Sequence, residues 1–413
     1  MKTVKYNVNT LVANKQYPLP RVHIDSDRLI FADEQSSVAT NPVWDMLWQK
    51  KWPGHIAVSC SSSVERVDCL KDKYNIELND EPYRTEYWTP KWLEWLTENL
   101  YGNAAQMQLP GDFCYALDVP GFVHGETQGI GDIFAAKVEL LSCGNFHVHP
   151  LSLTPEAIAD INPSLIAKSL YYKAVEYIKY ARATTQGILP FRNPVMTGPI
   201  DTANYLLGTN TLLEWLYTEP KAIHDLLGKT TDVLIQMVKA IRDAAGGYLC
   251  SHHLKCVRGG FDFCSEVRSL ISLDMYEEFE APYLRRIGQE LGAFSVHSCG
   301  NWEKNIPNII SDPNFRAMNG QIKENDLATI CKLASGNLTL SIGRSVDVHD
   351  RFIWPSTESY YRHILETVPN GQPFELTIEK EEDINLWGML HRQIRGNDYQ
   401  WTPPSFGNSK SCK

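Results

Sequence analysis

Short apolar segments that alternate with long amphipathic helices most constrain how this chain can fold. Apolar runs such as Val195–Met196 and Ser295–Val296 end in glycine, proline or polar residues. Apolar residues recur at helical spacing from Ile223 to Ile241. A second helix is predicted from an N-cap at Ser272 to a left-handed cap at Gly292. Strand and helix in this succession are typical of a parallel sheet with helical crossovers, so we predict an α/β fold.

The length of the chain fits one large domain with an N-terminal extension. An α/β barrel commonly uses about 200 to 250 residues as one domain, so 413 residues do not require two. We assign residues 110–390 to the core of a single domain that spans residues 1–413. Residues 1–105 are irregular and rich in tryptophan, and we expect them to pack on this core as an extension. A separate small domain is the alternative.

The charge and the absence of targeting patterns narrow the range of partners. The formal net charge is −10 and basic residues do not cluster, which argues against nucleic acid and anionic membranes as partners. The N-terminus lacks the apolar core of a signal peptide, and no apolar window is long enough for a transmembrane helix. The ten cysteines are scattered and read as reduced thiols. We therefore expect a cytoplasmic protein.

One motif places two metal-binding side chains at the end of a predicted strand. In the segment 295–301 an apolar strand runs into His297, Cys299 and Gly300. Residues two apart in a strand point to the same side, and imidazole and thiolate are both good zinc ligands. The motif predicts a metal or substrate site. The alternative is a buried histidine beside a small apolar cysteine.

Three other polar residues follow apolar runs and are further candidates. Glu266 closes an apparent strand just before a helix, where a carboxylate could bind a metal or a substrate. Asp118 also follows an apolar stretch. Tyr205 is predicted on the first turn of a helix that begins at Asp201 or Thr202, with its phenol turned inward. A solvated loop acid and a packing tyrosine are the corresponding alternatives.

The adjacent histidines His252 and His253 are weaker candidates for a site. Adjacent side chains diverge in most backbone conformations. We therefore expect this pair to be exposed to solvent.

The order of these motifs resembles the uroporphyrinogen-decarboxylase (URO-D) superfamily. The likeness covers residues 110–380 and rests on the run from Thr197 to Ile241 and on a second series of motifs. That series comprises Ser265-Glu266 through Ser272, Met275-Tyr276, Pro282-Tyr283, Arg285-Arg286 and His297-Ser-Cys-Gly-Asn301. The resemblance implies a (β/α)8 TIM barrel with its site at the C-terminal ends of the strands.

Two activities dominate that superfamily, and the first is cofactor-free decarboxylation of uroporphyrinogen in porphyrin biosynthesis. Asp118 and Tyr205 are similar in position to the catalytic Asp and Tyr of the decarboxylases. The N-terminal signature is only partly kept: Pro42-Val-Trp44-Asp-Met46 is present, but Lys50 and Lys51 stand where two arginines belong. Bidentate arginine is the natural clamp for a substrate with many carboxylates, so this departure weighs against decarboxylation. The late Gly-His-Gly element is also absent from residues 374–379.

The second activity is zinc-dependent methyl transfer between a corrinoid protein and a thiol. The metal motif of that group looks like His297-x-Cys299, and zinc activates a substrate thiol by lowering its pKa. The group has a further Cys in its last strand, where this chain has only Glu379, Glu381 and Glu382. Glu266 could complete the ligand set in place of that cysteine.

We therefore predict zinc-assisted methyl transfer between a corrinoid-type methyl carrier and a thiol or similar acceptor. The resemblance implies Zn²⁺ and a corrinoid carried by a partner protein, and it is compatible with a homodimer. The assigned roles are catalysis by Asp118 and Tyr205, metal binding by Glu266, His297 and Cys299, and substrate binding by Asn301 and Arg268. The alternatives are decarboxylation and a non-catalytic barrel that binds a tetrapyrrole or another small ligand.

Overall fold

The computed structural model describes residues 42–60, 119, 124–141, 146–163, 166–184, 191–253, 260–343, 354–378 and 383–396. Asp118, the acids at positions 379, 381 and 382, and most of residues 1–105 lie outside these ranges. All structural statements below concern the described part of the chain.

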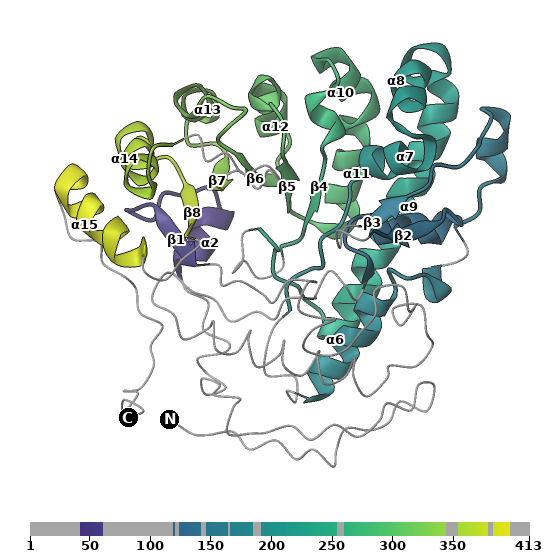
Figure 1. Cartoon of the computed structure of the whole chain (residues 1–413), viewed down its shortest axis with the longest axis horizontal. Helices are drawn as coiled ribbons and strands as arrows, with labels where there is room; N and C mark the ends of the chain where they lie inside the picture. Colours follow the sequence, from purple (N-terminus) through teal and green to yellow (C-terminus); the bar gives the residue numbers. More distant parts are fainter. Residues whose placement is uncertain are drawn as a thin grey trace.

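A parallel sheet forms the centre of the fold (Figure 1). It contains six strands in the order β1-β8-β7-β6-β5-β4, and every neighbouring pair is parallel. The strands are β1 (Ala57–Cys60), β4 (Asp262–Cys264), β5 (Phe294–Ser298), β6 (Phe315–Gln321), β7 (Thr339–Gly343) and β8 (Phe374–Ile378). Bridges from Arg192 to Cys250 and from Thr197 to Cys264 continue the parallel pairing beyond β4. The predicted α/β fold is confirmed, and β1 lies beside β8, as the first and last strands do in a (β/α)8 barrel.

The position of β1 corrects one boundary drawn from the sequence. The sequence predicts that residues 1–105 form an extension packed on the core. In the structure, all four residues of Ala57–Cys60 pair with β8 as a strand of the sheet. The preceding helix α2 (Pro42–Trp48) buries Trp44 and Leu47. The irregular, tryptophan-rich surroundings concealed a strand of only four residues. The single-domain assignment stays a prediction.

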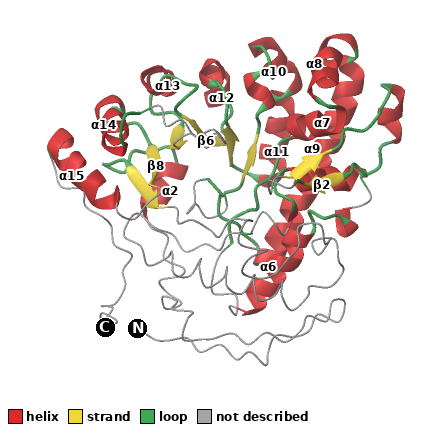
Figure 2. Ribbon diagram, in the orientation of Figure 1, coloured by secondary structure: helices red, strands yellow, loops and turns green. Residues whose placement is uncertain are grey.

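Helices line the outside of the strands (Figure 2). The longest, α9 (Pro220–Ala245), confirms the helical periodicity between Ile223 and Ile241 and buries that face in the core. The other α-helices are α6 (Lys173–Thr184), α7 (Pro199–Leu207), α8 (Thr209–Thr218), α10 (Leu273–Phe279), α11 (Ala281–Leu291), α12 (Ile306–Ser311), α13 (Leu327–Ala334), α14 (Thr357–Thr367) and α15 (Asp383–Arg395). A small antiparallel pair joins β2 (Val138–Leu140) to β3 (Phe146–Val148). In the described ranges, every helix is too short or too polar to cross a bilayer.

Two helix predictions need correction in detail. Ser272 caps α10 as expected, but the helix stops at Phe279 and α11 begins at Ala281. Pro282 explains the break, because its ring lacks an N–H and clashes with the preceding turn. The helix that carries Tyr205 begins at Pro199 rather than at Asp201 or Thr202, so Tyr205 lies near its end.

Candidate metal centre

Three of the predicted side chains converge at the carboxyl ends of β4 and β5. Glu266, His297 and Cys299 each offer one ligand atom, and these atoms all lie within 4.8 Å of one another. His297 Nε2 is 3.1 Å from Cys299 Sγ and 3.4 Å from Glu266 Oε1. One nitrogen, one sulfur and one oxygen therefore face a common point.

The local backbone explains why these residues meet. β4 and β5 are parallel neighbours, and Cys264 is paired with His297, so the loop after β4 rises beside the end of β5. The second carboxylate oxygen of Glu266 accepts a 2.5 Å hydrogen bond from the backbone N–H of Cys299. A glycine at position 300 lets the two loops lie this close together, because a Cβ at that position would lie 2.4 Å from the Cβ of Ser269.

Asp201 anchors the loop that carries Glu266. Its buried carboxylate accepts hydrogen bonds from the backbone N–H groups of Glu266, at 2.7 Å, and of Val267, at 2.9 Å. Burial raises the pKa of Asp201 to about 8, while these two hydrogen bonds oppose the shift. The sequence alone indicates Asp201 only as a possible first residue of a helix. In the structure it positions Glu266.

The ionisation behaviour of the three groups suits a cation. Burial lowers the pKa of His297 to about 3, with a further contribution from His253, so its imidazole is neutral at pH 7. Burial raises the pKa of Cys299 to about 12, and the neighbouring Glu266 adds to the shift. Burial also raises the pKa of Glu266. A bound cation would compensate both anionic forms, and metal coordination deprotonates a thiol.

Two separations between ligand atoms can be compared with the geometry of a zinc site. Zinc–ligand bonds of about 2.0 to 2.3 Å place tetrahedral ligands roughly 3.3 to 3.6 Å apart. The measured 3.1 and 3.4 Å between ligand atoms lie close to that range. The three side chains thus offer one nitrogen, one sulfur and one oxygen at separations compatible with a zinc ion.

The remaining predicted residues have different positions. Tyr205 is hydrogen-bonded to Thr127, with 3.3 Å between the hydroxyl oxygens, and its pKa is raised by burial and then by Asp201, with Glu266 contributing. Tyr205 therefore lies within electrostatic reach of Glu266. Asn301 donates from its side chain to the backbone oxygen of Glu324. Asp118 lies outside the described residues.

Arg268 is not available to a substrate, which corrects its assignment. Its side chain is fully buried and forms an ion pair with Glu280, which is 2% exposed. Its guanidinium also lies over the rings of Tyr276 and Phe315. The sequence did not reveal this partner because Glu280 sits 12 positions away, at the break between two helices.

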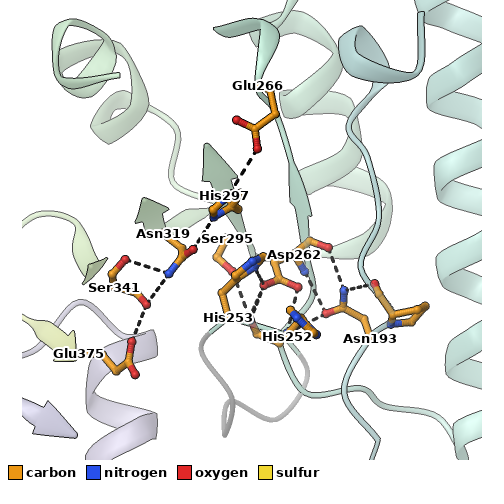
Figure 3. Close-up of polar contacts among 12 residues, drawn as sticks. Asn193, His252, His253, Asp262, Glu266, Ser295, His297, Asn319, Ser341 and Glu375 are labelled. Atoms are coloured by element: carbon orange, nitrogen blue, oxygen red, sulfur yellow. Dashed lines mark hydrogen bonds and ion pairs between the residues drawn. The ribbon is translucent and has the colours of Figure 1, made fainter. Parts of the chain in front are cut away.

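The sequence also missed polar residues that support the centre from β6. Asn319 Oδ1 is 2.5 Å from His297 Nδ1 (Figure 3). The side-chain nitrogen of Gln321 is 3.5 Å from Cys299 Sγ. Asn319 and Gln321 lie two residues apart in β6, whose other residues are largely apolar. A search for polar residues at period two in buried strands would have found them.

The expectation that His252 and His253 are exposed is wrong for both rings. Both residues are half-buried, and the His253 ring stacks on His297 with 4.7 Å between centroids. Its Nδ1 lies 2.5 Å from the buried carboxylate of Asp262, which also accepts the backbone N–H groups of both histidines (Figure 3). Burial would raise the pKa of Asp262, but His253 and these hydrogen bonds hold it well below its usual range.

Comparisons with known proteins agree with this architecture. The family model for uroporphyrinogen decarboxylase (URO-D) matches residues 138–324, a region that contains all three candidate ligands. A solved structure described as a methyltransferase from Methanosarcina mazei superposes with a TM-score of 0.61 at 14% identity. The superposition covers 86% of this chain and 99% of that protein. The predicted resemblance to the URO-D superfamily and its fold is confirmed.

One curated relative shares sequence with part of the chain. It is a methylated-thiol–coenzyme M methyltransferase from Methanosarcina mazei, 26% identical over 193 residues. The match covers 46% of this chain and 48% of the relative, so it spans about half the length of each protein.

Proposed function

We propose that this chain, which resembles the URO-D superfamily, is an enzyme that transfers a methyl group to a thiol or a similar acceptor with the help of zinc. The observation that carries the proposal is the convergence of Glu266, His297 and Cys299 at the ends of two parallel strands. The partial match to a methylated-thiol–coenzyme M methyltransferase supports the same reaction class.

In this proposal the three side chains hold zinc, and the remaining position takes the substrate thiol. Zinc would lower the pKa of that thiol, so that a thiolate rather than a thiol attacks the methyl group. The neutral His297 needs no deprotonation to bind metal, whereas Cys299 must lose its proton. Glu266 keeps one oxygen on the backbone of Cys299 and leaves the other free for the ion.

A corrinoid bound to a partner protein is the proposed methyl donor. This assignment rests on the resemblance to the URO-D superfamily, while the name of the curated relative supports only methyl transfer that involves a thiol. The proposed enzyme is soluble in the cytoplasm and needs neither nucleic acid nor membrane. Tyr205, whose pKa is influenced by Glu266, and Asp118 are proposed as further catalytic residues.

Metal analysis provides the first test of the proposal. Protein purified without chelator should contain close to one zinc per chain, and Cys299→Ser and His297→Ala should lose it. Cys331→Ser is the matched control, because Cys331 is a buried thiol on α13, away from the three ligands. Methyl transfer from methylcobalamin to a small thiol should disappear with the zinc. Wild-type protein that takes up no zinc would refute this mechanism.

Decarboxylation remains the second candidate, and one finding weakens it. A substrate rich in carboxylates needs cationic clamps, and Arg268, the arginine assigned to substrate binding, is paired with Glu280 in the core. Release of CO₂ from uroporphyrinogen by metal-free protein would favour decarboxylation. Tight binding of a tetrapyrrole with neither reaction would favour the non-catalytic alternative.

A further inference from the structure

We infer that Asn319 is a positioning residue that fixes which nitrogen of His297 is free to bind a ligand. Ser341 and Glu375 are inferred to hold Asn319 in place from the next two strands. The part of this inference that concerns metal affinity rests on the proposed zinc site. The part that concerns the tautomer of His297 does not.

The supporting residues form a row across four neighbouring parallel strands (Figure 3). His297 on β5 pairs in register with Asn319 on β6, which pairs with Ser341 on β7, which pairs with Glu375 on β8. Their side chains are joined in the same order: His297 Nδ1 to Asn319 Oδ1 at 2.5 Å, and Asn319 Nδ2 to Ser341 Oγ at 2.8 Å. Ser341 Oγ then donates to Glu375 Oε2.

The chemistry of the row determines the direction of each hydrogen bond. The Asn319 amide nitrogen also donates to the backbone oxygen of Ser341, at 2.9 Å, and a carbonyl oxygen can only accept. The amide oxygen of Asn319 must therefore face His297. Because that oxygen can only accept, His297 Nδ1 must carry the proton, which leaves the lone pair on Nε2. Nε2 is the atom that faces Cys299 and Glu266.

Glu375 fixes the far end of the row. Its carboxylate is fully buried and accepts hydroxyl hydrogen bonds from Ser59 at 2.6 Å, Thr377 at 3.0 Å and Ser341. Ser59 belongs to β1, so the row reaches across the junction of the first and last strands. With its hydroxyl proton directed to Glu375, Ser341 Oγ is left as an acceptor for Asn319. The orientation of Asn319 is thus determined by groups that do not touch the metal centre.

Nitrogen NMR of the imidazoles tests the tautomer directly. In metal-free wild-type protein labelled with ¹⁵N-histidine, His297 should show a protonated Nδ1 and an unprotonated Nε2 at about neutral pH. Asn319→Leu, which keeps the volume but removes both polar atoms, should give a mixture of tautomers. A protonated Nε2 in wild-type protein would overturn the inference without any measurement on a variant.

Zinc affinity, measured against a chromophoric chelator, provides the second readout. Loss of the hydrogen-bond partner of a metal-bound histidine weakens metal binding about 10- to 100-fold, and we expect Asn319→Leu to fall in that range. Ser298→Ala is the matched control: the Ser298 hydroxyl lies next to His297, is buried, and has no hydrogen-bond partner among the described residues. The control should stay within about twofold of wild type.

The outcomes separate this inference from the proposed function. If wild-type protein binds zinc and Asn319→Leu binds it equally well, Asn319 does not position His297. If wild-type protein binds no zinc, the proposed function fails, and the nitrogen spectra still decide the inference. Circular dichroism of each variant checks that the fold is retained. Should Asn319→Leu fail to fold, the wild-type spectrum remains the deciding measurement.

Discussion

Removal of Arg268 should show how strongly the buried ion pair with Glu280 stabilises the fold. The perturbation is Arg268→Met, which leaves the Glu280 carboxylate buried, with the Ser265 hydroxyl still donating to it. Breaking one side of a buried ion pair destabilises a protein by about 3–5 kcal/mol, because the remaining charge stays desolvated. Arg268 donates three hydrogen bonds to Glu280 from two different nitrogens, so we expect a destabilisation in the upper half of that range.

A double variant distinguishes an unpaired charge from lost packing. Arg268→Met combined with Glu280→Leu replaces both charges by apolar groups, and such replacements are often neutral or stabilising. The free energy of unfolding should therefore recover to within about 1 kcal/mol of wild type. Equilibrium unfolding in urea, followed by tryptophan fluorescence at constant pH and checked for reversibility, measures all three proteins.

Two results would refute this reasoning. A destabilisation of less than about 1 kcal/mol in Arg268→Met would mean that the pair is not desolvated as the structure shows. Loss of substrate binding in a well-folded double variant would mean that Arg268 serves the substrate after all, as its place in the sequence suggested.

Three shorter predictions concern the loops around the metal centre. Zinc affinity should rise about tenfold for each pH unit near neutrality, because the pKa of Cys299 is about 12 and one proton must leave for each zinc bound. Chelator competition at several pH values measures this slope, and an affinity that does not change with pH would mean that Cys299 is not a ligand. Gly300→Ala should destabilise the fold by about 1–3 kcal/mol in urea, and a second change, Ser269→Gly, should restore it if the clash is the cause. Asp201→Asn should lower the free energy of unfolding by about 1–3 kcal/mol, since the backbone N–H of Glu266 or of Val267 loses its acceptor. The same change should weaken zinc binding, and an unchanged zinc affinity would argue against a role of Asp201 in positioning Glu266.

The sequence predicted the parts of the fold that depend on local patterns. The helical periodicity of α9, the cap at Ser272 and the α/β alternation are properties of neighbouring residues, and all three are present. The strand β1 was missed because four residues carry too little periodicity to stand out from irregular surroundings.

For the candidate site, the sequence identified the metal-binding residue types but not the groups that hold them. His297 lies in β5 and Cys299 follows directly after its last residue, so their proximity follows from the two-residue spacing at the strand end. Strand register alone brings Asn319 to His297 and joins Glu375 to the row through Ser341, and the sequence does not show which strands are neighbours. The burial of Arg268 likewise depends on a partner from another element.

The pairing of β1 with β8 bears on when this protein can fold. Ser59 and its hydrogen-bond partner Glu375 are 316 positions apart, so the ribosome must release most of the chain before the two strands meet. Contacts of such long sequence separation slow folding and leave an open strand edge exposed in the meantime. A polypeptide interrupted before β8 would lack both the last strand of the sheet and the carboxylate at the end of the row behind His297. Such a product would also leave the edges of β1 and β7 that pair with β8 without their partner strand.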